Sequence, residues 1–150
     1  MITFTNGNMF ACEADILVNT VNCIGKMGKG LAEEFKYRYP KMHKDYVKAC
    51  DDNRVRIGVP HVWTSNDLFA PVTIINFPTK KHWANDSKYE YILEGLDWLR
   101  NYLLQHPDKS IAIPPLGCGN GNLDWNIVGG LIANVLSGLD NKITIFEPNL

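Results

Sequence analysis

The segment that says most about the fold is Pro114-Pro115-Leu116-Gly117-Cys118-Gly119-Asn120-Gly121-Asn122-Leu123-Asp124-Trp125. It connects a short apolar run to a helical pattern through a loop with glycine at three of five positions. Because glycine adopts positive φ and has no Cβ, successive N–H groups of such a loop can point into one cavity and bind an anion. The positive end of the following helix dipole would favour the same ligand. The segment predicts either an anion-binding loop or a β–α connection that only needs tight turns.

Short strand patterns alternate with helical patterns on both sides of this loop. Strands are expected over residues 2–5, 16–21, 61–64, 72–77, 110–113 and 142–146, and helices over 29–39, 40–50, 87–105 and from Asp124 to just before Gly138. Ser87 and Glu90 have the spacing of a capping box at the start of the third helix, and Asp124 is expected to cap the fourth. Strands separated by helices of this length predict an α/β fold with a largely parallel sheet and helices on both faces.

The composition is that of an ordinary soluble domain. A chain of 150 residues, 45% hydrophobic and 21% charged, fits one domain with a substantial core. No apolar run approaches the roughly 18 residues of a membrane span, and no basic-then-hydrophobic leader is present, so a cytosolic location without membrane association is expected. The cysteines are far apart, which predicts reduced thiols and indicates neither a disulfide framework nor a zinc site: Cys12, Cys23, Cys50 and Cys118. No metal or other cofactor is expected.

Positive charge is concentrated in one part of the chain. Seven basic residues and only three acidic ones lie between positions 26 and 48, and Lys142 is the only basic residue beyond position 110. This asymmetry suits a phosphate-binding face, but a solvated helix surface is the commoner explanation of such a run.

A second polar segment follows the predicted strand 16–21, and ligands of such sheets bind at the carboxyl ends of strands. Asn19 and Asn22 precede a stretch with glycine at positions 25, 28 and 30. Amide side chains can exchange hydrogen bonds with sugar hydroxyls, or they can cap local turns. The spacing of the glycines matches neither a nucleotide-hydrolysing loop nor a dinucleotide-binding fingerprint.

The third polar segment, residues 76–83, carries the most reactive side chains. Lys80 lies just past a predicted strand and could act as a nucleophile or as an acid. His82 and Trp83 could stack on a nucleobase, as in proteins that hold single strands. Adjacent lysines such as Lys80 and Lys81 are also common on solvated loops. One pocket could use all three segments.

Together these segments resemble the macrodomain family, and the likeness covers nearly the whole chain, with residues 1–150 as a single domain. The matching stretches are residues 18–22 with 27–30, then 76–83, then 114–125. The likeness is greatest to DNA ADP-ribosyl glycohydrolase antitoxins of the DarG type. It is weaker to the terminal ADP-ribose glycohydrolase and to ADP-ribose 1″-phosphatases. The resemblance implies a mixed, mostly parallel sheet with helices on both faces.

The resemblance also implies an ADP-ribose cleft. Lys80 would act at the anomeric carbon of the distal ribose, and Asn22 would contact that ribose as the second catalytic residue. The other residues implied to bind ADP-ribose are Asn8, Met9, Asn19, Met27, Gly28, Lys29, Gly30, Thr79, Pro115, Leu116, Gly117, Cys118, Gly119, Asn120, Gly121 and Asn122. Residues implied to face DNA are Lys81, His82 and Trp83.

Three positions depart from the family pattern. Asn8 replaces the aspartate that commonly binds adenine, so its amide oxygen would accept a hydrogen bond without a charge. Asn122 stands where the antitoxins tend to have glycine. Gly121 stands where the animal enzyme has an acid, so Lys80 would need another acid or a water molecule as its partner.

The activity that the resemblance implies is hydrolysis of the bond between ADP-ribose and a thymine base in single-stranded DNA. Hydrolysis of ADP-ribosyl esters on protein, or of ADP-ribose 1″-phosphate, is an alternative that would use the same cleft. A non-catalytic ADP-ribose reader is a third possibility. The expected ligand is ADP-ribose or the modified DNA. The candidate protein partner is an ADP-ribosyltransferase toxin on a separate chain, and the alternative is a stand-alone repair or defence-countering protein without a toxin. The chain itself is expected to be a monomer.

Overall fold

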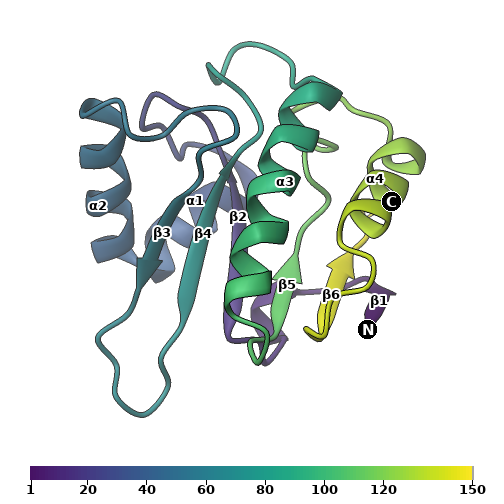
Figure 1. Cartoon of the computed structure of the whole chain (residues 1–150). Helices are drawn as coiled ribbons and strands as arrows, with labels where there is room; N and C mark the ends of the chain where they lie inside the picture. The colour runs from purple at the N-terminus through teal and green to yellow at the C-terminus, as the bar shows by residue number, and fades with distance from the viewer. Residues whose placement is uncertain (150) are drawn as a thin grey trace.

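The computed structural model describes residues 1–149, which contain a mixed six-stranded sheet (Figure 1). The strands are β1 (Ile2–Thr5), β2 (Ile16–Val21), β3 (His61–Thr64), β4 (Thr73–Pro78), β5 (Ile111–Ile113) and β6 (Ile143–Phe146). Their order across the sheet is β1-β6-β5-β2-β4-β3, and only the β3–β4 pair is antiparallel. The predicted strands are confirmed to within one residue at each end. Leu150, the last residue of the predicted domain, lies outside the described residues.

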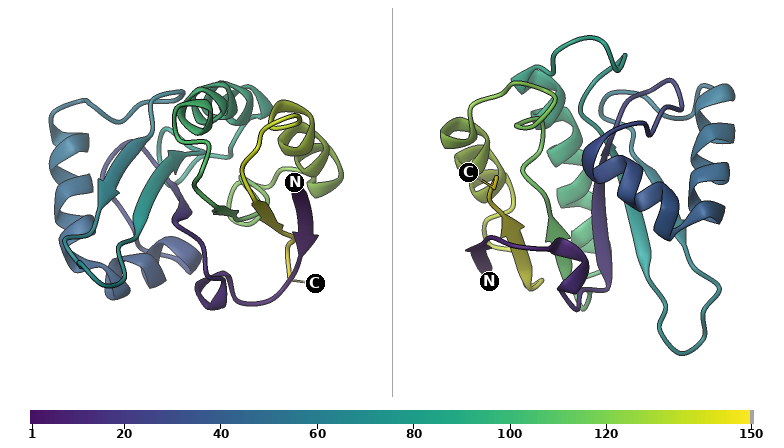
Figure 2. Two further views of the ribbon diagram at one scale, coloured as in Figure 1. Left: turned by 60° about the horizontal axis from the view of Figure 1, so that its bottom comes forward. Right: turned by 180° about the vertical axis from the view of Figure 1, so that it is seen from behind.

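Four α-helices flank this sheet in the described part of the chain: α1 (Gly30–Arg38), α2 (Pro40–Asp51), α3 (Tyr89–Gln105) and α4 (Trp125–Val135). Figure 2 shows α3 and α4 on one side of the sheet and α1 and α2 on the other, which confirms the predicted α/β architecture. Pro40 begins α2 at the first helical position, where its missing N–H costs nothing. Among residues 1–149, no helix is both long enough and apolar enough to cross a membrane.

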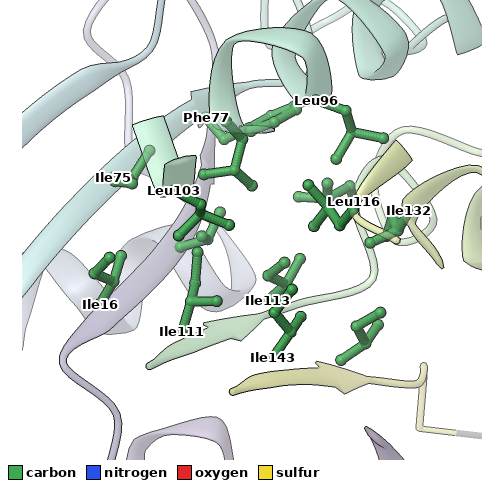
Figure 3. Packing of buried hydrophobic residues seen from close by; sticks show 14 of the residues in the cluster. Ile16, Ile75, Phe77, Leu96, Leu103, Ile111, Ile113, Leu116, Ile132 and Ile143 are labelled. Carbon is green, nitrogen blue, oxygen red and sulfur yellow. The ribbon is translucent and has the colours of Figure 1, made fainter. Parts of the chain in front are cut away.

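The apolar side chains form one buried cluster on each face of the sheet. The cluster beneath α3 and α4 is aliphatic apart from Phe77, and Figure 3 shows its central part. Phe77 packs against Gly95 of α3, where a Cβ would lie only 2.6 and 2.7 Å from two ring carbons. Glycine therefore lets α3 approach the end of β4 closely. The second cluster, beneath α1 and α2, includes Phe35 and Tyr46.

The start of α3 differs from the prediction. Lys88, not Ser87, occupies the N-cap position, and no side chain caps this helix. Ser87 is buried, and its hydroxyl donates a hydrogen bond to the Thr79 carbonyl instead. The expected capping box is therefore wrong, because Ser87 bonds to a loop rather than to its own helix. Asp124 does cap α4 as predicted, since its carboxylate accepts a hydrogen bond from the Asn126 N–H at 2.9 Å.

Candidate functional site

Three loops meet at the carboxyl edge of the sheet (Figure 1). They are the first loop (residues 22–29) after β2, the lysine loop (79–88) after β4 and the glycine loop (114–124) before α4. Because β5, β2 and β4 are neighbours in the sheet, loops that are far apart in the sequence emerge side by side.

Backbone hydrogen bonds attach the lysine loop to the first loop. The Thr79 N–H donates to the Val21 carbonyl at 2.9 Å, and the Cys23 N–H donates to the Lys81 carbonyl at 3.2 Å. The Cys23 thiol also donates to the Lys80 carbonyl at 3.5 Å. The backbone of Lys80 is therefore held against the end of β2, while its ammonium Nζ donates to the Trp83 carbonyl at 3.3 Å on the exposed side.

The lysine loop is also attached to the glycine loop. The Ser87 N–H donates to the Gly121 carbonyl at 3.1 Å, and the Ser87 hydroxyl bonds back to Thr79, next to Lys80. A second connection is formed by side chains, since Asn122 Nδ2 donates to Asp86 Oδ1 at 2.7 Å. The lysine loop is thus held on both sides of Lys80.

The glycine loop has room for a ligand on one side only. Gly117 has a φ of +72°, and its carbonyl accepts a hydrogen bond from the Leu123 N–H at 2.9 Å. A Cβ on Gly121 would overlap that carbonyl, whereas a Cβ on Gly119 would meet nothing within 4 Å. The loop faces the start of α1, because a Cβ on Gly30 would lie 3.8 Å from Asn120 Nδ2. The open side at Gly119, beside an N-terminal helix end, suits an anion.

The Asn22 amide organises the first loop. Its Oδ1 accepts hydrogen bonds from the N–H groups of Ile24 at 3.1 Å and Lys26 at 3.3 Å, and its Nδ2 donates to the Lys26 carbonyl at 2.8 Å. Tyr46 donates to the Asn22 carbonyl at 2.8 Å from α2. Burial raises the pKa of the Tyr46 hydroxyl, so this group stays a donor throughout the physiological range.

A chain of buried polar groups runs beneath the same loop. Asn19 Nδ2 donates to Asn76 Oδ1 at 3.0 Å, and Asn76 Nδ2 lies 2.9 Å from His61 Nδ1. The other ring nitrogen, Nε2 of His61, lies 2.8 Å from the carboxylate of Asp45 on α2. Asn19 also contacts the sulfur of Met27 at 3.8 Å, so the chain connects α2 with the start of the glycine-containing segment 27–30.

A cavity of about 420 Å³ lies beside these loops. It is lined by Gly7, Asn8, Met9, Phe10, Leu31, Glu34, Pro114, Pro115, Phe146, Glu147, Pro148 and Asn149. Its size is in the range of small-molecule sites, and its walls combine apolar side chains with a few amides and carboxylates. Asn8 begins a 3₁₀ turn (Met9–Ala11) there, because its Oδ1 accepts a hydrogen bond from the Phe10 N–H at 3.0 Å.

The thiols near the site are poor nucleophiles. Burial raises the pKa of Cys23 and of Cys118 to about 11 in each case, and for Cys118 the nearby Asp124 carboxylate acts in the same direction. Within residues 1–149 no three His, Cys, Asp or Glu side chains form a group that could hold a metal ion. Lys80, the predicted catalytic residue, lies on the lysine loop, which is bonded to both other loops, and its catalytic role stays a prediction.

Comparison with known proteins decides the family. The Macro domain model matches residues 18–132. The chain belongs to the macro domain family. It is 44% identical to a DNA ADP-ribosyl glycohydrolase of Mycobacterium tuberculosis over 99% of its own length but only 42% of that protein. The chain thus spans less than half the length of this relative.

Solved structures agree with this assignment. The macrodomain of Mycobacterium tuberculosis DarG matches with a TM-score of 0.95 at 44% identity, covering 99% of each chain. Thermosipho africanus DarTG, solved in complex with ADP-ribose, matches with a TM-score of 0.92 at 33% identity over 98% of this chain and 41% of that one. A weaker likeness, as expected, is to a human ADP-ribose glycohydrolase, 26% identical over 97% of this chain and 90% of that one.

The macrodomain fold brings most of the predicted site residues to this edge, though in two groups. Asn8, Met9 and Pro115 line the cavity, whereas Lys80 and residues 116–122 of the glycine loop are not part of its lining. The DNA-facing candidates Lys81, His82 and Trp83 follow Lys80 directly, and Trp83 is exposed. These roles stay predictions.

Other predicted contacts lie below the surface. Asn19 has no exposed area and Met27 is 2% exposed, so both side chains support the loops from beneath in this structure. Sequence reasoning missed Phe146 and Glu147 in the cavity wall, together with Ser87 and Asp86 in the lysine loop. The strand 142–146 is the last element that the sequence predicts, and its apolar pattern does not indicate that a site lies at its end.

Proposed function

We propose that this macrodomain removes ADP-ribose from bases of single-stranded DNA by hydrolysis. The observation that carries the proposal is the 44% identity to a DNA ADP-ribosyl glycohydrolase over 99% of the chain. The position of Lys80 on a loop that is bonded to both neighbouring loops supports it, because a reactive side chain needs a fixed backbone to reach one atom of a bound substrate. The cavity beside the glycine loop is the proposed adenosine site.

The proposed reaction breaks the bond between C1″ of the distal ribose and a nitrogen of the base. The bonding electron pair leaves with the base, which takes up a proton, and water supplies the hydroxyl group at C1″. Lys80 can assist in two ways. As an ammonium group it would donate the proton to the departing base. As a neutral amine it would attack C1″ through Nζ, and water would then release the sugar from the lysine.

The test is release of ADP-ribose from a modified thymine-containing oligonucleotide. We expect Lys80→Ala to abolish turnover while free ADP-ribose still binds in calorimetry. Lys109→Ala, which removes an exposed lysine at the opposite edge of the sheet, serves as the control and is expected to keep full turnover. Full activity of Lys80→Ala would refute the assignment.

The same assay separates the alternative substrates. An ADP-ribosyl ester on a protein carboxylate and ADP-ribose 1″-phosphate are offered at equal concentration with the oligonucleotide. A preference for either would replace DNA as the substrate. Tight binding of ADP-ribose without any product would make the domain a reader.

The proposed biological partner is an ADP-ribosyltransferase that modifies the same DNA. A relative in Thermosipho africanus is named a fusion of a DNA ADP-ribosyl transferase with a DNA ADP-ribosyl glycohydrolase, which supports the pairing of the two activities. Residues 1–150 are proposed to form one macrodomain, monomeric and cytoplasmic. Sedimentation of the purified chain would test the monomer.

A further inference from the structure

The side chain of Asn122 connects the glycine loop to the lysine loop on the exposed side of the site. Its Nδ2 donates to Asp86 Oδ1 at 2.7 Å, a short distance typical of a hydrogen bond to a charged acceptor. The only other direct link between the two loops described above is the backbone bond from Ser87 to Gly121. Unlike that backbone bond, the Asn122–Asp86 bond is formed by two side chains, so substitutions can remove it.

The backbone conformation of Asn122 does not require the asparagine side chain. Asn122 has a φ of +63°, a left-handed conformation that glycine adopts without penalty. Asparagine is among the few other residues that tolerate it. A glycine would therefore satisfy the backbone here, whereas the amide adds a contact across to Asp86.

The lysine loop transmits this contact toward Lys80. Residues 80–86 form no helix or strand. Within them, the Lys80 ammonium donates to the Trp83 carbonyl at 3.3 Å, and the Asn85 N–H donates to the His82 carbonyl at 3.2 Å. One end of this segment is held by Cys23, and the other end carries Asp86. Ser87, the next residue, is anchored separately to Gly121 and Thr79, so losing the Asp86 contact would loosen residues 81–86 between the two anchored ends.

We propose that Asp86 and Asn122 form a positioning pair that holds Lys80 at the distal ribose for turnover. This inference rests on the proposed hydrolase, but the pair itself can be tested without catalysis. Asp86 and Asn122 are not required to touch the reacting atoms, and their effect should fall on kcat more than on ADP-ribose binding. The sequence alone did not indicate that these two residues anchor the lysine loop.

The variants are chosen to separate the contact from strain and from charge. Asn122→Gly removes the amide while keeping a residue suited to the positive φ, and it changes no net charge. Asp86→Ala removes the acceptor. The exchange Asp86→Asn with Asn122→Asp rebuilds a carboxylate–amide pair in the opposite order. Asp97→Ala, on the exposed surface of α3, is the control for loss of one acidic residue.

We expect Asn122→Gly and Asp86→Ala each to lower kcat about tenfold, less than the roughly 100-fold that a 1 Å misplacement can cost. The double variant should be no slower than either single variant, because both changes break the same contact. The exchange should restore kcat to within about twofold. The dissociation constant for ADP-ribose should change less than about twofold in every variant, because the Asn122 amide bonds to Asp86 and would not serve as the ADP-ribose contact that the resemblance implies.

Hydrogen–deuterium exchange provides the readout that does not depend on activity. Amides of residues 81–86 should exchange faster in Asn122→Gly and Asp86→Ala, and at the parental rate in the exchange variant and in Asp97→Ala. Unchanged amide exchange in both single variants, additive effects on kcat, or no recovery on exchange would overturn the proposal. If the parent chain releases no ADP-ribose from DNA, the proposed function fails, and amide exchange still decides whether the pair fixes the loop.

Discussion

Replacing Gly121 by alanine should deform the glycine loop, and the cost follows from the distances. An added Cβ would overlap the Gly117 carbonyl oxygen and lie 2.9 Å from the Gly117 carbonyl carbon and Cα. Ordinary contact begins at 3.4 Å, so the two backbone segments must separate by at least about 0.5 Å. That oxygen also accepts the Leu123 N–H, and the Gly121 carbonyl accepts the Ser87 N–H. Overpacking costs about 1–3 kcal/mol, and each lost hydrogen bond about 1 kcal/mol.

The free energy of unfolding should therefore fall by about 2–5 kcal/mol. For a chain of 150 residues this lowers Tm by about 4–20 °C. Thermal melting with and without ADP-ribose measures both effects, since ligand binding to the native state raises Tm. We expect Gly121→Ala to melt early and to lose most of the stabilisation by ADP-ribose.

Gly119→Ala is the matched control, because a Cβ there meets nothing within 4 Å. It should melt within about 2 °C of the parent, yet lose affinity for ADP-ribose if the ligand occupies that open side. An unchanged Tm for Gly121→Ala would refute the packing argument. A low Tm combined with normal stabilisation by ADP-ribose would show that the loop is structural and does not bind the ligand.

Two further predictions concern packing and thiol reactivity. Gly95→Ala should lower the free energy of unfolding, measured by urea titration, by about 1–2 kcal/mol, because the clash with Phe77 outweighs the gain of about 1 kcal/mol in helix propensity. Gly130→Ala is the control: open space surrounds it, so this variant should keep the gain in stability. Burial and the Asp124 carboxylate raise the pKa of Cys118 to about 11, so only about 0.1% of this thiol should be thiolate at pH 8. Alkylation of Cys118, followed by mass spectrometry, should therefore be slow at pH 8 and about tenfold faster per pH unit up to pH 10. Fast labelling at pH 8 would contradict the raised pKa.

The fold was predictable because its signals are local and repeated. The apolar run at 16–21 and the β-branched run at 72–77 each predict a strand that the structure contains. Helices of 9 to 17 residues lie in most connections between the strands of the sheet. What the sequence could not give was the antiparallel direction of β3, since strand direction depends on how a connection crosses the sheet. The Met9–Ala11 turn is also too short to leave a periodic pattern.

The site was predictable in part, because glycines and lysines just after the predicted strands indicate at which edge of the sheet a ligand would bind. Ser87 shows where such reasoning fails. Its spacing to Glu90 is that of a capping box, yet the hydroxyl donates to the carbonyl of Thr79, eight residues back at the start of the lysine loop. A local hydrogen bond and a tertiary one use the same serine, and only the folded geometry decides between them.

Asn19 illustrates the same ambiguity for amides at the ends of strands. In the register of β2 and β4, Asn19 lies opposite Asn76, so their amides pair inside the sheet. A carboxylate only accepts hydrogen bonds, so His61 donates through Nε2 to Asp45 and its Nδ1 must accept from Asn76. The three bonds from Asn19 through Asn76 and His61 to Asp45 then all point toward α2, and Asn19 Oδ1 is left buried without a partner among the described residues. A polar residue in an apolar strand can thus bond within the sheet as well as mark a site, so the predicted contact of Asn19 with ADP-ribose stays a prediction.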